Sequence, residues 1–263
     1  MAKAIKPVTA LAFAAGLVLA STGSASAFFS LVIGEAGEPA TNFHLTDNDA
    51  NDQNANLGAI TFNSGCAGCP GPLIIGNYAV NRILSNVSSG APGAAVLHLR
   101  IEGATASSAA SGLAAYATAD GLFASGAVPS GSGFVTNATL DGNASAPDTG
   151  NFPASVTWDA WVNPSNTPSA TEQLVDSLAV QAGDFADVGN VFAAFASGGS
   201  SVSLVEGSPF SITQSLVINT DGPGEFAGFG RTTVAPVPAA LPLMASAFAA
   251  VGLLRLRRRK GRA

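Results

Sequence analysis

Short segments in which apolar and polar side chains alternate at every second residue run through the middle of the chain. In segment 94–102, Leu97, Leu99 and Ile101 would lie on one side of a strand and the polar residues between them on the other. Segment 210–218 alternates in the same way. A two-residue period is typical of a β-strand with one buried and one solvated face, whereas an amphipathic helix repeats every 3.6 residues. The chain is therefore expected to fold from antiparallel strands.

The alternating segments are separated by glycine, asparagine, aspartate, serine and proline, which favour turns. Strands are expected at residues 28–33, 41–45, 57–63, 78–87, 94–102, 112–118, 133–140, 154–162, 173–181, 191–196, 201–205, 210–218 and 225–234. Turns are expected at Asp141-Gly142, Asp221-Gly222, Ala91-Pro92-Gly93 and Ser130-Gly131, and a loop between two strands within residues 104–119. This pattern predicts an all-β fold, an antiparallel two-sheet β-sandwich of the jelly-roll or immunoglobulin-like kind, in one domain at residues 28–233.

The charges of the chain are distributed unevenly. All 17 acidic residues lie between Glu35 and Glu225, whereas only Arg82, Arg100 and Arg231 of the 11 basic residues belong to the body of the chain. The body therefore carries three basic against 17 acidic residues, a net charge of −14, and contains no lysine. Such a body repels phosphate backbones, so we expect no nucleic-acid partner.

Residues 1–27 have the pattern of a secretory signal peptide. Lys3 and Lys6 precede a mostly apolar segment at residues 8–20, and Ala25-Ser26-Ala27 supplies the small residues that signal cleavage requires. The alternative is a non-cleaved anchor, although an apolar segment of this length is short for a hydrocarbon core of about 30 Å.

Residues 234–263 combine a proline motif, an apolar segment and a basic cluster. The motif consists of Ala235, Pro236, Val237, Pro238 and Ala239, and the cluster of Arg255, Arg257, Arg258, Arg259 and Lys260. Residues 237–254 would span about 27 Å as a helix, which is just enough to cross a bilayer. A single transmembrane helix is therefore expected, with the basic cluster in the cytoplasm and the body on the other side of the membrane.

This tail resembles the PEP-CTERM protein-sorting signal, in a form closest to its VPLPA variant. The resemblance implies that a membrane protease-transpeptidase, an exosortase, cuts at Pro236, Val237, Pro238 and Ala239 and releases or re-anchors the body. The chain departs from the variant at Ala235, where the variant usually has valine. It departs from the parent motif at Val237, where the parent motif has an acidic residue. Carriers of such tails are Gram-negative surface and matrix proteins, often linked to exopolysaccharide. A permanent single-span anchor is the alternative.

The densest group of oxygen-bearing side chains lies at residues 47–52. Asp47, Asp49 and Asn51 match the first, third and fifth positions of a looped calcium site. An EF-hand is excluded because Asp52 stands at the position of its glycine and Gly58 at the position of its last glutamate. Two interpretations are left, a looser calcium site and a polar hairpin loop in which these side chains satisfy backbone groups, and we favour the loop.

The two cysteines, Cys66 and Cys69, lie three positions apart. Outside the cytoplasm the expected outcome is a structural disulfide that closes a tight loop, with free thiols as the alternative. A zinc site would need two further ligands, and His44 and His98 are the only imidazoles, so none is expected.

Trp158 and Trp161 lie three residues apart, so their rings point to opposite faces of the expected strand 154–162. One ring is expected in the core. For Trp161 two interpretations are left, burial by the second sheet or a loop, which we favour, and stacking on a sugar ring beside Asp159. The chain contains no zinc-protease motif, no phosphate loop and no nucleophile elbow in a strand-to-helix setting, so no catalytic residue and no enzymatic activity are predicted.

These features predict an exported cell-surface or matrix protein with a structural or adhesive role. Its expected partners are an exosortase, the membrane during sorting, and exopolysaccharide. It would be anchored briefly in the inner membrane and then reach the cell surface or the extracellular space. Alternatives are a carbohydrate-binding or carbohydrate-active module and a permanently anchored protein on the periplasmic side. No cofactor is expected, and calcium at residues 47–52 is the alternative.

Overall fold

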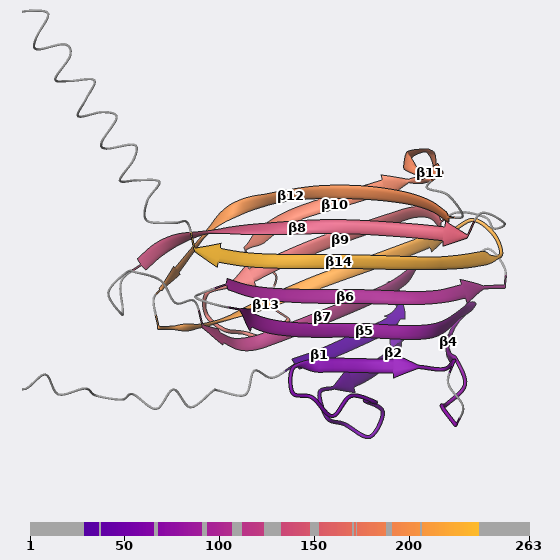
Figure 1. Cartoon of the computed structure of the whole chain (residues 1–263), viewed down its shortest axis with the longest axis horizontal. Helices are drawn as coiled ribbons and strands as arrows, with labels where there is room; N and C mark the ends of the chain where they lie inside the picture. Colours follow the sequence, from indigo (N-terminus) through magenta and orange to yellow (C-terminus); the bar gives the residue numbers. More distant parts are fainter. Residues whose placement is uncertain are drawn as a thin grey trace, which may run out of the picture.

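The computed structural model contains two antiparallel β-sheets that lie face to face (Figure 1). It describes residues 29–36, 38–65, 68–90, 94–106, 112–123, 133–147, 153–169, 171, 173–187, 191–205 and 207–236. Every strand pair in both sheets is antiparallel. The prediction of an all-β, two-sheet antiparallel sandwich is therefore confirmed.

The six-stranded sheet has the order β10-β9-β13-β7-β1-β2. Its strands are β10 (Leu174–Gln181), β9 (Pro153–Asn163), β13 (Pro209–Thr220), β7 (Leu113–Phe123), β1 (Phe29–Glu35) and β2 (Glu38–Thr46). In Figure 1 this sheet lies behind the other.

The eight-stranded sheet has the order β11-β12-β8-β14-β6-β5-β3, and β4 pairs with β5 beside this path. Its strands are β11 (Ala186–Asp187), β12 (Val191–Val205), β8 (Gly133–Pro147), β14 (Gly224–Pro236), β6 (Ala94–Thr105), β5 (Tyr78–Gly90), β3 (Ala59–Asn63) and β4 (Leu73–Ile75). A 3-10 turn, η2 (Ala182–Asp184), precedes β11. From β6 onward the chain crosses repeatedly between the sheets, so distant segments become neighbours.

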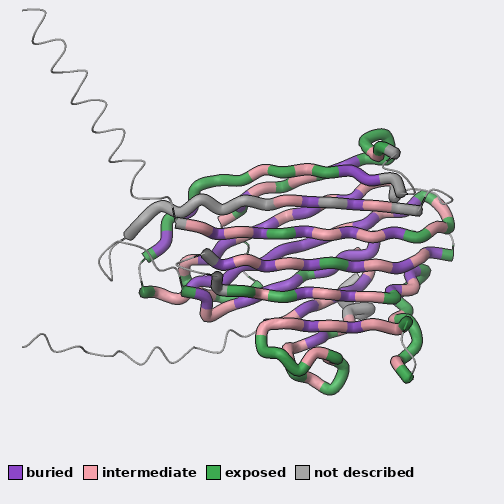
Figure 2. Tube along the Cα trace, viewed as in Figure 1, coloured by how far each residue is buried: buried purple, intermediate pink, exposed green. Residues whose placement is uncertain are grey.

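The hydrophobic core fills the space between the two sheets, as the alternating burial along strands such as β3 and β6 indicates (Figure 2). Leu97, Leu99 and Ile101 of β6 are fully buried, and the residues between them face outward, as the alternation predicts. Strand β13 differs, because Thr213 and Ser215 on its outer side are also buried.

The centre of the core is a tryptophan packed on glycine. Trp158 of β9 is fully buried, and a Cβ atom at Gly142 of β8 would lie 2.6 Å from its Cδ2 atom. Gly142 pairs directly with Gly230 of β14, on which the Gln214 side chain of β13 rests. Two neighbouring strands therefore lack side chains at the point where the six-stranded sheet inserts its largest ring.

This packing overturns the predicted turn at Asp141-Gly142, which lies inside β8. Glycine here serves close packing between the sheets rather than a chain reversal. Similarly, the two strands predicted at 191–196 and 201–205 are one strand, β12, which runs through Gly198. Asp176 and Leu178 of β10 occupy the space that a side chain at Gly198 would need.

Other predicted boundaries agree with the structure. The turn at Asp221-Gly222 joins β13 to β14, and residues 104–119 contain the end of β6 and the start of β7. The short strands β4 and β11 were not predicted, because they are too short to show a period. The turns expected at 91–93 and 130–131 lie outside the described residues.

The two expected membrane-related segments also lie outside the described residues: all of residues 1–27, and residues 237–263 of the tail. Over the part of the chain that is described, no helix has the length and apolar character needed to cross a membrane. Strand β14 continues to Pro236, so the chain belongs to the sheet up to the first proline of the motif.

Gly142→Ala is expected to destabilise the fold by about 1–3 kcal/mol, because the new methyl group would collide with the Trp158 ring in a filled core. Gly183→Ala is the matched control, since no atom lies within 4 Å of a Cβ atom there, and it should change stability by less than about 0.5 kcal/mol. Urea unfolding of the two variants beside the wild type measures the difference. Equal midpoints for both variants would contradict the packing argument.

Candidate functional site

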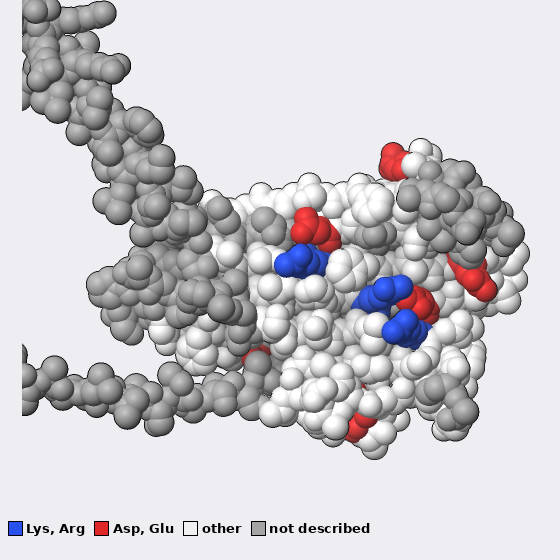
Figure 3. All heavy atoms as spheres, in the orientation of Figure 1, with Lys and Arg blue, Asp and Glu red and all other residues white. Residues whose placement is uncertain are grey.

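The outer face of the eight-stranded sheet gathers all the positive charge of the described residues. Arg82 of β5, Arg100 of β6 and Arg231 of β14 are the only Lys or Arg residues in this part of the chain. Each lies on the side of its strand that points away from the core, and Figure 3 shows the blue groups on this face in two places, each beside a red carboxylate. The rest of the described surface carries acidic residues without basic ones.

Each guanidinium group has an acidic neighbour on this face. The Oε1 atom of Glu102 in β6 lies 2.5 Å from Nη2 of Arg100 and 3.9 Å from Nη1 of Arg82, so one carboxylate is shared by two arginines. Asp141 of β8 lies directly opposite Arg231 in the strand register. Asp141 also accepts a 2.6 Å hydrogen bond from the Ser197 hydroxyl of β12.

Phe229 of β14 is the centre of this face. Arg100 lies opposite it on β6, and the His98 ring makes an edge contact with it at a centroid distance of 5.7 Å. Burial and the positive charge of Arg231 both hold the pKa of His98 below its ordinary value. The imidazole is therefore neutral at physiological pH, when it offers one donor and one acceptor.

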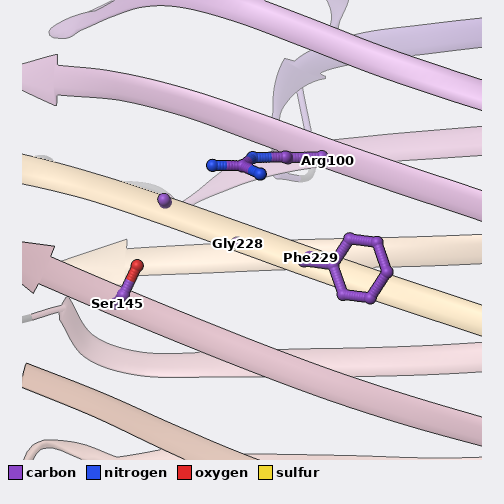
Figure 4. Close-up of a pocket in the computed structure, with 5 residues that line it drawn as sticks. Arg100, Ser145, Gly228 and Phe229 are labelled. Atoms are coloured by element: carbon purple, nitrogen blue, oxygen red, sulfur yellow. The ribbon is translucent and has the colours of Figure 1, made fainter. Parts of the chain in front are cut away.

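Two shallow hollows lie on either side of Phe229. The first, of about 280 Å³, is lined by Arg100, Ser145, Ala227, Gly228 and Phe229. Figure 4 shows the guanidinium group and the Ser145 hydroxyl on opposite sides of β14, with the Phe229 ring at one end. The second hollow, of about 410 Å³, is lined by Asp141, Gly142, Phe195, Ala196, Ser197 and Phe229.

The second hollow has apolar walls and a polar end. Phe195 of β12 is 68 % exposed, compared with 44 % for Tyr116 and 43 % for Phe123. Gly142 and Ala196 face the core and contribute their backbone to the floor of this hollow, while Asp141 and Ser197 provide an acceptor and a donor. The arrangement offers apolar ring surfaces next to hydrogen-bonding groups, which suits ligands that have both apolar and hydroxylated faces.

The residues of the predicted calcium loop lie elsewhere, between β2 and β3. Their carboxylates accept backbone hydrogen bonds: Asp47 from Gly58 at 2.7 Å, and Asp52 from Thr61 at 2.9 Å. Asp49 accepts from the loop backbone as well. Within the described ranges no group of three or more His, Cys, Asp or Glu side chains is placed to hold a metal ion. These contacts are typical of a polar loop whose carboxylates accept hydrogen bonds from the protein backbone, and the calcium site stays a prediction.

Cys69 lies in the connection between β3 and β4 at the edge of the eight-stranded sheet, and the tryptophan candidate lies in the other sheet. Cys69 is disulfide-bonded, while Cys66, the predicted partner, lies outside the described residues. Trp161 is half-buried on the outer side of the six-stranded sheet, the opposite side of the sandwich. Asp159, on the same side of β9, accepts a 3.2 Å hydrogen bond from the Ser215 hydroxyl.

The sorting motif is only partly described. Ala235 and Pro236 are the last residues of β14 and pair with Asn137 and Thr136 of β8. Val237, Pro238 and Ala239 lie outside the described residues, as do the five basic residues of the predicted topology cluster, Arg255, Arg257, Arg258, Arg259 and Lys260.

Sequence reasoning missed Phe195 and Phe229. No local pattern indicates that the two rings face outward, because alternation alone would place a phenylalanine between small residues, Ala194 and Ala196 or Gly228 and Gly230, on the core side. The missing information was that β12, β8 and β14 are neighbours, which brings the two rings to one face.

The calcium prediction is tested by thermal unfolding with and without a chelator. A bound ion that prefers the folded state must raise the unfolding midpoint. Because the loop carboxylates already accept backbone hydrogens, we expect the chelator to leave the midpoint unchanged. A fall in the midpoint that added calcium restores would establish a metal site.

The polar loop also predicts a pH dependence. Burial alone would raise the pKa of Asp49, but backbone N–H groups of Thr46, Asn51 and Asp52 outweigh it and hold the pKa below the ordinary value of 3.8. The folded state thus favours the ionised form, so its contribution to stability is present above the unfolded pKa and is lost as the pH falls through the folded pKa.

Asp49→Asn should therefore lose less stability than the wild type between about pH 5 and about pH 3. Urea midpoints at both pH values measure this loss. Asp221→Asn, in an exposed turn, is the control and should keep the slope of the wild type. An equal change of the urea midpoint with pH in the Asp49 variant and the wild type would contradict the role of these hydrogen bonds.

Comparisons with known proteins show no family. No family model matches the chain, and no curated protein matches it. Among solved structures, the K1 cleaved adhesin domain of Lys-gingipain from Porphyromonas gingivalis W83 has a TM-score of 0.30 at 11% identity, covering 79% of this chain and 90% of that one. The infectious bursal disease virus VP2 subviral particle has a TM-score of 0.21 at 10% identity, with 89% and 73% covered. Similarities of this size carry no inference about function.

Proposed function

We propose that this chain is an exported surface or matrix protein with a structural or adhesive role, associated with exopolysaccharide and processed at its C-terminus by an exosortase. The export signal pattern at residues 1–27 and the proline motif, apolar segment and basic cluster at residues 234–263 support this proposal. The body between them is a two-sheet β-sandwich.

The observation that carries the proposal is the position of the proline motif relative to the fold. The last strand, β14, ends at Pro236, the first proline of the motif. A cut beyond this residue would leave both sheets with all the strands that the structure describes. The body could thus leave its membrane segment without losing a part of its core.

The shape of the exposed sheet supports an adhesive role. The hollows beside Phe229 are open to solvent on the outer face of the sheet rather than enclosed. An extended polymer can lie along such a face, which presents contacts over several strands. A site at Trp161 and Asp159, on the other side of the sandwich, is the second candidate, because Trp161 is only half-buried.

The processing step is tested by mass spectrometry of the C-terminus of protein recovered outside the inner membrane. We expect the chain to end within residues 236–239, because the motif follows the last strand and precedes the apolar segment. The variant Val237→Asn with Pro238→Asn should keep peptides from beyond Leu254 and stay in the membrane fraction.

A control replacement in the same tail, Ala245→Ser, should be processed as the wild type is. Peptides from beyond Leu254 in the exported wild-type protein would contradict the sorting proposal and favour a permanent anchor.

A further inference from the structure

We propose that the outer face of the eight-stranded sheet binds an extended polysaccharide that carries isolated carboxylate groups and that lies across the strands from β12 to β6. This proposal rests on the adhesive function proposed above and names its ligand class and its binding surface. It is argued from the aromatic spacing, the hydrogen-bonding groups and the charges of the described residues.

The two aromatic rings lie in one row across the sheet. Phe195 of β12 pairs with Asn143 of β8, Asn143 pairs with Phe229 of β14, and Phe229 pairs with Arg100 of β6. Phe195 and Phe229 are thus two strand spacings apart, about 10 Å. This is the length of a disaccharide unit in an extended glycan, so the rings can stack on alternate sugars of a chain that runs perpendicular to the strands.

Stacking suits these rings because one face of a sugar ring exposes mainly C–H groups, which pack on the electron-rich face of an aromatic ring. Phe195 is 68 % exposed, so much of its surface is available without rearrangement of the fold. The hollow between the rings lies over the backbone of Gly142 and Ala196, whose Cβ positions face the core, and a sugar can enter it from the outer side.

The rims of both hollows carry the polar groups that sugar hydroxyls need. Arg100 and Ser145 line the first hollow, and Asp141 and Ser197 line the second. Together they supply guanidinium donors, a carboxylate acceptor and hydroxyl groups that do both. Figure 4 shows the guanidinium group lying along β14, where it can reach a ligand group seated beside Phe229.

One local group of charges favours a ligand with carboxylates. Arg82, Glu102 and Arg100 have two positive charges against one negative. Elsewhere on the same face Arg231 lies opposite Asp141, and Glu225 adds a further carboxylate, so the excess of positive charge is confined to the pair of arginines beside Glu102. Arginine binds carboxylates through paired hydrogen bonds. Nowhere else in the described surface does a basic side chain offer such contacts.

The acidity of the body does not oppose this selection. The two sheets pack about 10 Å apart, while charges in physiological salt are screened over about 8 Å. Acidic groups on the far side of the sandwich therefore contribute little at Phe229. A nucleic acid differs from a sparsely charged glycan, since its closely spaced phosphates require many basic contacts, and this face has three arginines.

The proposal is tested with the purified full chain on surfaces of immobilised hyaluronan, polygalacturonate and alginate, each beside its carboxyl-reduced form. We expect binding to at least one carboxylated polymer and at least tenfold weaker binding to its reduced form. Phe195→Ala and Arg100→Gln should each raise the Kd by about tenfold, whereas Phe195→Trp should keep the affinity, because it retains an aromatic platform.

Phe123→Ala is the matched control, because Phe123 is an exposed phenylalanine at the end of β7 in the other sheet, and it should leave the Kd unchanged. Thermal midpoints equal to that of the wild type establish that each variant is folded.

Several results would overturn the proposal. The protein could bind none of the three polymers, or it could bind the carboxyl-reduced forms equally well. A loss of affinity with Trp161→Ala that Phe195→Ala does not produce would also contradict the proposal. Binding to single-stranded DNA that Arg100→Gln abolishes would assign the face to nucleic acid instead. A concentration-dependent dimer that Phe195→Ala dissociates would assign it to a second copy of the chain.

The two proposals fail in different ways. A protein that is processed at its C-terminus but binds none of the polymers contradicts the binding proposal alone. A protein that binds but keeps its tail outside the inner membrane contradicts the sorting proposal alone.

Discussion

The contact between Trp158 and the Gly142–Gly230 pair determines how the two sheets fit together. The ring is the largest fully buried side chain, and it fits because two adjacent strands have no side chain beneath it. The same contact also sets the outer face. Because Gly142 and Gly230 point into the core, their neighbours Asp141, Phe229 and Arg231 must point outward. The packing of the core and the layout of the candidate site are two consequences of one glycine pair.

Period and composition were sufficient to predict the strands, since alternation depends on residues close in sequence. The errors fell at glycines. Gly142 and Gly198 were read as breaks between strands, yet each lies within a strand and makes room for a side chain from the opposite sheet. The sequence does not show whether a glycine permits a turn or permits close packing between sheets. The two roles differ only in whether a side chain from a distant part of the chain packs against the glycine. For the site, alternation placed His98 and Arg100 outward, but the approach of Phe195 to Phe229 depends on strand order, which no local pattern contains.

The loop at residues 47–52 illustrates a second limit of sequence reasoning. A carboxylate that accepts backbone N–H groups and one that binds a cation occupy the same kind of sequence, because both need acidic residues at short spacing. In the structure Asp49 accepts hydrogen bonds from Thr46, Asn51 and Asp52. Oxygen atoms used in this way hold the loop between β2 and β3 in one conformation. The sequence narrowed the choice to two interpretations and favoured the one that these contacts support.

The position of β14 relates the fold to the proposed processing. This strand lies between β8 and β6 in the middle of the eight-stranded sheet, and its residues Phe229 and Arg231 form part of the candidate binding face. Pro236 ends the strand, and proline suits this place because it has no N–H group with which to extend the ladder. A cut before Pro236 would remove residues that pair with β8, while a cut after it would remove none. Selection for a released, intact body would therefore place the cut beyond Pro236, in the part of the motif that follows the strand carrying the centre of the face.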